Sequence, residues 1–321
     1  MNTGSDEKIL ALCGGVGGAK LAYGLTQILP PEELVIAVNT ADDFVFHGLN
    51  ISPDIDSVIY HLSKRNNPEL GWGVQDDTWN FMDALEQVGV DSWFRLGDKD
   101  LVTHILRTEL LGEGKSLTDA TATIASTYGI SHRILPMTDD PVHTKVETEQ
   151  GWLDFQAYFV KEQCRPKVKG FRFAGIECAQ VQVDLLRLLK GGGIGGIIIC
   201  PSNPFVSIDP ILSLPEMRSL LESRTFPVIA VSPIVNGKAI KGPAAKMLQE
   251  LGAEVSSAAV LSFYQGLIDG YVVDKTDSDC NDVGDNDITV RSTQTVMKES
   301  EDKIALATFC CRFLKELRES A

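Results

Sequence analysis

Four aspartates crowd one short stretch of the chain. Asp42 and Asp43 follow the apolar run 34–38, and Asp54 and Asp56 come shortly afterwards. The run is short and rich in β-branched residues, which is typical of a buried strand in a parallel sheet. The four side chains are therefore expected just past the carboxyl end of a strand, where open α/β sheets bind their ligands.

Carboxylates this close together repel one another unless a cation, a hydrogen-bond network or a substrate hydroxyl compensates. The stretch therefore favours a metal and substrate site. Ser52 and Pro53 also look like the start of a helix, with Ser52 as its cap and Pro53 in its first turn. An acidic loop followed by an ordinary helix start is the alternative interpretation.

A glycine-rich turn precedes the aspartates. The apolar run 9–13 leads into 14–18, which holds four glycines, and leucines then follow at helical spacing. Such a strand, glycine loop and helix can bring backbone amides close to a phosphate. The pattern is neither GxGxxG nor a P-loop, since no Ser or Thr follows Lys20. Beside the acidic loop it favours a phosphate and metal site, and a plain tight turn is the alternative.

Three other segments carry polar or aromatic groups. Ser202 and Asn203 lie between two prolines after the apolar run 196–200, and could contact a ribose, a phosphate or a base, or simply form a turn. Asp100, His104 and Arg107 share one face of an expected helix, which could equally be a solvated face with an ion pair. Two further aromatic residues could stack on a flat ring or belong to a core: Trp72 and Trp79.

The order of apolar runs and helical patterns predicts one α/β domain over 1–321, with a mostly parallel sheet and helices on both faces. Alternation with a period of two predicts a small β-rich inserted subdomain over 143–176, including a strand over 152–160. The acidic segment 274–292 lacks the spacing of an EF-hand and is predicted to be a surface loop.

Composition narrows the class of protein. The 321 residues carry a formal charge of -15, which disfavours nucleic-acid and anionic membrane partners. The seven cysteines show no zinc-type spacing, and we interpret them as reduced thiols of a cytoplasmic protein. Neither a signal peptide nor a membrane-spanning run is apparent.

Several loops occur in a characteristic order. They are 14–18, 39–43, 52–56, 96–100 with Thr103 and His104, 135–141, 201–204 and 231–234. Together they closely resemble the 2-phospho-L-lactate transferase family of deazaflavin coenzyme F-420 biosynthesis, over about 9–274. The resemblance implies a Rossmann-like core and a homodimer. It also implies a magnesium-dependent transfer of a phospholactyl or phosphoenolpyruvyl group from a guanosine diphosphate-type donor to the ribityl hydroxyl of the deazaflavin Fo, with release of GMP.

The resemblance also implies roles for individual residues. Asp43 would bind Mg²⁺, with Asp54 as a second ligand. Asp56 and Arg95 would lie against Fo, although the family often has Lys where this chain has Arg95. Asp56 is also our candidate for orienting or deprotonating the ribityl hydroxyl, so that Asp43 and Asp56 are the predicted catalytic residues. The glycine loop and 202–203 would hold the donor, and the remaining substrate-binding residues are then Gly14, Gly15, Gly17, Gly18, Asn39, Ser202 and Asn203.

Two other functions compete with this one. A regulatory protein that binds a nucleotide sugar without catalysis could share the fold, but the apolar segment 44–46 after the acidic loop suits a flat deazaflavin ring better than a sugar. An NAD-dependent dehydrogenase is disfavoured because the chain lacks GxGxxG in its glycine loop.

Overall fold

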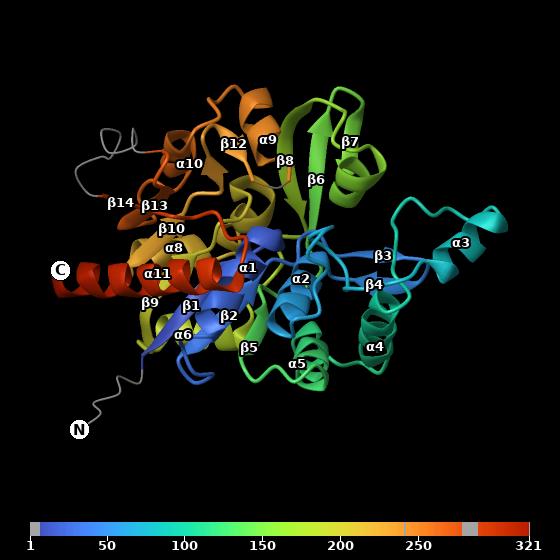
Figure 1. The fold of residues 1–321 in the computed structure, drawn as a ribbon, viewed down its shortest axis with the longest axis horizontal. Helices are drawn as coiled ribbons and strands as arrows, with labels where there is room; N and C mark the ends of the chain where they lie inside the picture. Colours follow the sequence, from blue (N-terminus) through green and yellow to red (C-terminus); the bar gives the residue numbers. More distant parts are fainter. Residues whose placement is uncertain (1–6, 241, 278–287, 321) are drawn as a thin grey trace.

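A parallel sheet forms the centre of the protein (Figure 1). The computed structural model describes residues 7–240, 242–277 and 288–320. Within them, seven strands pair in the order β14-β13-β10-β9-β1-β2-β5, every pair parallel. The strands are β1 (Lys8–Cys13), β2 (Leu34–Val38), β5 (Arg133–Pro136), β9 (Ile194–Ile199), β10 (Val228–Val231), β13 (Gly270–Asp274) and β14 (Thr289–Thr293).

Successive residues of β1 show how the sheet builds two cores. Leu10 and Leu12 belong to the apolar cluster on one face, whereas Ala11 and Cys13 belong to the cluster on the other. Side chains alternate between the faces of a strand, and a sheet covered on both faces needs apolar residues at every position. This explains the uninterrupted apolar runs and confirms the predicted α/β class with helices on both faces.

Helices cover the two faces in two groups. The first face packs against α1 (Gly15–Thr26), α2 (Pro53–Leu62), α5 (Leu117–Thr127) and α11 (Ser300–Ser320). The second face packs against α6 (Val183–Lys190), α7 (Asp209–Leu212), α8 (Met217–Glu222), α9 (Ala244–Glu250) and α10 (Ser257–Phe263). No helix in the described ranges combines the length and the apolar character needed to cross a membrane.

Smaller elements lie around the central sheet. Two hairpins are β3 (Phe44–Phe46) with β4 (Leu49–Ile51), and β11 (Ile234–Val235) with β12 (Lys238–Ala239). A further antiparallel sheet has the order β7-β6-β8, with β6 (His143–Thr148), β7 (Gly151–Asp154) and β8 (Val168–Ala174). The segment between α2 and α5, which we call the excursion, carries helices α3 (Asn80–Gln87) and α4 (Asp100–Gly112) and extends to the right in Figure 1. Two short π-helical turns are η1 (Ala157–Lys161) and η2 (Pro204–Ile208).

Two predictions about strands were wrong. The strand expected over 152–160 ends at Asp154, and η1 follows, because this segment turns so that Tyr158 packs in a cluster with Val146 of β6 and Met247 of α9. The surface loop expected over 274–292 contains most of β14, which pairs in parallel with β13. Residues 278–287 of that acidic segment lie outside the described residues.

Candidate active site

A cavity of about 650 Å³ opens at the carboxyl edge of the central sheet. Its wall takes Gly14 from the loop after β1, Asp42 from the loop after β2, Ser202 from the loop after β9 and Ser232 from the loop after β10. These four strands are neighbours in the sheet. Because parallel strands end at the same edge, loops far apart in sequence meet there, as the sequence predicted.

Aromatic side chains line the cavity from two sides. Trp72 and Phe94 come from the excursion that carries α3, and Phe155 and Phe159 come from the inserted β6–β8 segment. The rings of Phe155 and Phe159 stack with centroids 5.5 Å apart. The two sides leave an apolar space that can accept a flat ring between them.

Asn39 connects the two carboxylates nearest the glycine loop. Its Nδ2 donates to Asp42 Oδ1 at 3.1 Å and to Asp54 Oδ2 at 3.0 Å. Asp54 Oδ1 also accepts from the Gly15 amide at 2.6 Å, and Gln156 from the inserted segment donates to Asp42 Oδ2 at 3.3 Å. The cluster is therefore built from three separate parts of the chain.

Burial makes these carboxylates costly to ionise. It raises the pKa of Asp54 to about 6 despite hydrogen bonds from Asn39 and Gly15. Burial, followed by the charges of Asp54 and Asp43, holds the pKa of Asp42 well above its usual value. Burial likewise raises the pKa of Asp43, and its hydrogen bond from Ser52 only partly opposes this. A cation among the three would favour their charged forms.

Asp43 offers an oxygen to such a cation. Its Oδ2 accepts from Ser52 Oγ at 2.6 Å, while its Oδ1 is buried without a hydrogen-bond partner among the described residues. The predicted cap is wrong in one respect, because Ser52 precedes α2 but uses its hydroxyl on Asp43 and not on the helix. An orphaned carboxylate oxygen beside Asp42 and Asp54 fits a hard divalent ion.

The protein's own groups do not complete a metal site. In the part of the chain that the structure describes, no group of three or more His, Cys, Asp or Glu is arranged to hold a metal ion. Mg²⁺ commonly binds one or two carboxylates and takes its other ligands from water and substrate phosphates. The residues therefore fit a magnesium ion shared with a phosphate-bearing substrate, which Asp43 and Asp54 would hold if it binds.

Asp56 faces away from this cluster and toward α4. Arg107, which is fully buried, donates to both carboxylate oxygens of Asp56. His104 lies beside them, with its Nδ1 3.6 Å from Asp56 Oδ2. The alternative interpretation of Asp100, His104 and Arg107 as a solvated face is thus wrong, because all three side chains are buried between α4 and α2.

The structure brings most of the predicted site residues to one cavity. Eight of them line it: Gly14, Gly15, Gly17, Asp54, Asp56, Arg95, Ser202 and Asn203. Gly18, Asn39 and Asp43 do not line it. Asn39 is fully buried, and both ends of its amide are used, since Oδ1 accepts from Ala41 N. The side-chain amide of Asn39 is therefore occupied within the protein, which favours positioning of the carboxylates over direct contact with a substrate.

The glycine loop has a packing role that the sequence did not indicate. A Cβ at Gly17 would lie 2.1 Å from Pro201 O, and one at Gly14 would lie 2.4 Å from Ser207 Cβ. The amide of Gly14 donates to Ser202 Oγ at 3.1 Å, and that of Gly15 to Asp54. The glycines thus allow the loops after β1 and β9 to touch, and these two amides already have acceptors within the protein.

Gly17→Ala should therefore destabilise the protein by about 1–3 kcal/mol, because the backbone oxygen of Pro201 cannot move aside as a flexible side chain could. The free energy of unfolding in urea measures this. Gly112→Ala is the matched control, since no atom lies within 4 Å of its new Cβ, and Ala at that helical position should be neutral or slightly stabilising. Equal effects of the two substitutions would contradict the packing role.

Sequence reasoning missed several residues of the cavity wall. Tyr60 and Gln156 line it, and so do Thr295 and Met297 from the segment after β14. Thr295 is held there by Asp274, whose Oδ2 accepts from its amide at 2.8 Å. Gln156 carries no local signal, since its position depends on how the inserted segment folds back. For Thr295 the sequence offered one indication, because Asp274 places a carboxylate at the end of β13, where it can hold a neighbouring loop.

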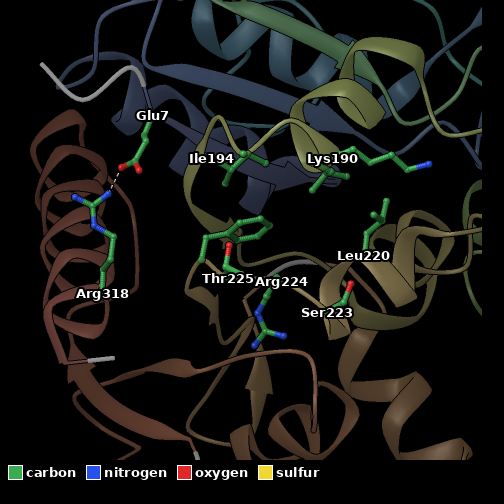
Figure 2. Close-up of a pocket in the computed structure, with 11 residues that line it drawn as sticks. Glu7, Lys190, Ile194, Leu220, Ser223, Arg224, Thr225 and Arg318 are labelled. Carbon is green, nitrogen blue, oxygen red and sulfur yellow. Dashed lines mark hydrogen bonds and ion pairs between the residues drawn. The ribbon is translucent and has the colours of Figure 1, made fainter.

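A second hollow, of about 390 Å³, lies at the amino ends of β1, β9 and β10 (Figure 2). Its cations are already paired, since Lys190 contacts Glu216 at 2.6 Å and Arg224 contacts Asp269 at 2.7 Å. Figure 2 also shows Arg318 of α11 paired with Glu7. Ligands of open α/β sheets bind at the opposite edge, so we assign the active site to the larger cavity.

Fold and cavity together define a Rossmann-like α/β protein with a small-molecule site at the carboxyl edge of its sheet. Residues 9–307 match the family model described as 2-phospho-L-lactate transferase CofD. The chain belongs to this family, as its loops predicted, and is a transferase.

Individual relatives agree with the family. The chain is 43% identical over 269 residues to the 2-phospho-L-lactate transferase of Methanosarcina acetivorans, covering 84% of this chain and 86% of that one. It is 36% identical to the phosphoenolpyruvate transferase of Streptomyces griseus, covering 97% and 99%. A crystal structure of a UPF0052 family member from Bacillus halodurans shares the fold, with a TM-score of 0.63 at 15% identity over 95% of this chain and 98% of that one.

Proposed function

We propose that the protein transfers a phospholactyl or phosphoenolpyruvyl group from a guanosine diphosphate-type donor to the ribityl hydroxyl of the deazaflavin Fo, releasing GMP. The observation that carries this proposal is a single cavity with buried carboxylates at one end and aromatic walls at the other. Diphosphate chemistry with a metal suits the first end, and a flat ring suits the second. The names of the relatives support both phospho-acids as the transferred group.

The cavity divides between the two substrates. Ser202 and Asn203, in the loop after β9, would hold the guanosine and diphosphate beside Gly17 and the helix start of α1. Lys20 also lines this end, with its Nζ 2.9 Å from Met297 O, and adds a positive charge. The Fo ring would lie between the aromatic walls near Arg95, whose guanidinium lies 5.0 Å from the centre of the Trp79 ring.

The reaction forms one bond and breaks another. The ribityl oxygen bonds to the phosphorus of the phospho-acid, the bond from that phosphorus to the GMP oxygen breaks, and the hydroxyl proton passes to solvent. Mg²⁺ held by Asp43 and Asp54 would neutralise the diphosphate and the departing GMP. Asp56 would accept a hydrogen bond from the hydroxyl and orient it. Because Arg107 already donates to both oxygens of Asp56, orientation is a better role for this carboxylate than taking the proton.

Product formation tests the proposal directly. The protein is incubated with Fo, Mg²⁺ and each guanylylated phospho-acid in turn, and the products are identified by mass. We expect GMP together with Fo extended by one phospho-acid. Binding of a nucleotide sugar without turnover of any donor would favour the regulatory alternative. A homodimer in the cytoplasm is part of the same proposal, and light scattering of the purified protein tests the dimer.

Asp43→Asn should raise the Mg²⁺ concentration for half-maximal rate by about tenfold, because one charged ligand is lost. The orphaned Oδ1 of Asp43 is the structural reason. Magnesium titration of the rate at saturating donor measures the change. Asp209→Asn is the control, since Asp209 is a half-buried carboxylate with a raised pKa that bonds to Ser213 and does not belong to the aspartate cluster. Superimposable titrations of parent and Asp43→Asn would exclude Asp43 as a ligand.

Asp56→Asn should lower kcat by about a hundredfold, because an amide cannot accept as strongly from the attacking hydroxyl. The KM for the donor should change little, since the guanosine that anchors the donor would lie at the other end of the cavity. Steady-state kinetics with each substrate varied in turn separates the two effects. Arg107 then faces an amide, so the folded fraction is checked by circular dichroism. An unchanged kcat would remove the role of Asp56.

A further inference from the structure

A buried network of charged and polar side chains lies directly behind Asp56. Arg107 NH1 is 3.1 Å from Asp56 Oδ2, and NH2 contacts Oδ1, so the guanidinium holds the carboxylate at two points. His104 Nδ1 lies 3.6 Å from the same Oδ2 and 3.5 Å from Arg107 NH1. A two-point contact fixes the plane of a carboxylate, which a single hydrogen bond does not.

A second layer holds the imidazole of His104. Its Nε2 lies 3.2 Å from Asp100 Oδ1, one turn earlier on α4. Tyr60 of α2 donates its hydroxyl to that same oxygen at 2.5 Å. Burial acts against the charge of Asp100, yet its contacts with His104 and Tyr60 hold its pKa below the usual value. The imidazole thus lies between two carboxylates, one from each helix, within ion-pair distance of both.

The position of this network argues against a purely structural role. Asp56, Tyr60, Asp100 and His104 all line the cavity, so the network reaches the space where the acceptor would bind. Ion pairs buried in a protein also add little net stability compared with apolar packing, because desolvation offsets the attraction. If the contact between α2 and α4 served stability alone, apolar packing would suffice and no buried ion pair would be needed.

We propose that Arg107 and His104 are positioning residues, which hold the carboxylate of Asp56 in one orientation toward the acceptor hydroxyl. Asp100 and Tyr60 in turn hold His104. This inference rests on the proposed function, since it assigns a purpose to residues that act through Asp56. It adds four residues of α2 and α4 to the machinery of the acceptor end.

A double-mutant cycle tests whether these residues act through Asp56. His104→Gln should lower kcat by about tenfold or more, as a misplaced reacting group does, with little change in the KM for the donor. In an Asp56→Asn background the same substitution should change kcat by less than about twofold, because its target is gone. If His104→Gln lowers kcat by the same factor in both backgrounds, the two residues act independently and the proposal is overturned.

Two further variants keep the test decisive. His104→Asn places an amide near the position of Nδ1, facing Asp56, whereas His104→Gln places one nearer Nε2, so the Asn variant should retain more activity. Arg107→Lys keeps the charge but not the two-point contact, and it enters the same cycle if the His104 variants fold poorly. If His104→Asn and His104→Gln are equally active, and Arg107→Lys lowers kcat by the same factor with and without Asp56→Asn, then His104 and Arg107 have only a structural role.

The control is His132→Gln. His132 also contacts a protein oxygen, with Nε2 2.9 Å from Leu29 O, but it does not line the cavity. Its kcat should match the parent's. Failure of the proposed function would show as no product from the parent protein itself. Failure of the positioning role would show as normal product formation by the parent with additive losses in the cycle, so the two failures are distinguishable.

Discussion

Arg107→Met should lower the free energy of unfolding by about 3–5 kcal/mol, the usual cost of leaving one member of a buried ion pair without its partner. Arg107 is fully buried, and Asp56 beside it is almost as inaccessible. Met has a similar length and no charge, so the loss would come from the stranded carboxylate and only slightly from packing. Unfolding in urea, followed by circular dichroism, measures it.

The double variant Asp56→Asn, Arg107→Met separates charge from shape. With neither charge present, most of the lost stability should return, since whole buried pairs can often be replaced without net cost. Activity should stay at the level of Asp56→Asn alone. A loss below about 1 kcal/mol in the single variant would instead mean that water or a neighbour replaces the guanidinium. Such a result would also weaken the positioning role of Arg107.

The central sheet could be predicted because its strands are buried on both faces. The run 34–38 coincides with β2, whose residues are all buried. β14 was missed for the opposite reason. It is an edge strand whose residues are half-buried or exposed, and its sequence of Thr, Val, Arg, Ser and Thr shows no apolar run. An edge strand pairs through its backbone on one side, and that pairing leaves little trace in side-chain type.

The sequence predicts where the site lies, but it does not predict which side chains contact one another there. Gly14, Asp42 and Ser202 each follow a strand, and parallel strands carry their ends to a common edge. Whether Arg107 faces solvent or another helix depends on how α4 packs against α2. Its periodicity shows only that Asp100 and His104 share its side of the helix. The partner, Asp56, lies 51 residues away in the sequence.

The same limit applies to the glycine loop and to Asn39. Glycines suit both a phosphate and a close approach of two loops, and only the position of Pro201 shows that the second reason operates at Gly17. Asn39 stands where a ligand-binding residue is expected, directly after β2. Its burial and its bonds to Asp42 and Asp54 show that it acts on the carboxylates. The chemistry of the site thus depends on groups one layer behind the cavity wall.

Asp54→Asn should change the pH dependence of stability in a chelator-containing buffer. Burial raises the pKa of Asp54 from 3.8 to about 6, so the folded protein binds this proton more tightly than the unfolded chain does. Stability from this group is therefore full below pH 3.8 and is lost as the pH rises through 6, by about 3 kcal/mol in total. The stability of the variant relative to the parent should rise by about 2 kcal/mol of this total between pH 4.5 and 7.5, because part of the change falls below pH 4.5.

In Asp54→Asn the new amide faces Asn39, and any stability lost for that reason is the same at every pH. The test therefore uses the change with pH of the stability difference between variant and parent, and not its absolute value. Asp98→Asn is the control, because hydrogen bonds from Thr78, Phe81 and Asn80 lower the pKa of Asp98 to about 2, and its effect should be constant over this range. Mg²⁺ should stabilise the parent at pH 7.5 by binding the ionised cluster, and should stabilise Asp54→Asn much less. A difference between variant and parent that is flat with pH would show that Asp54 is solvated, and the crowded carboxylates would then need no cation.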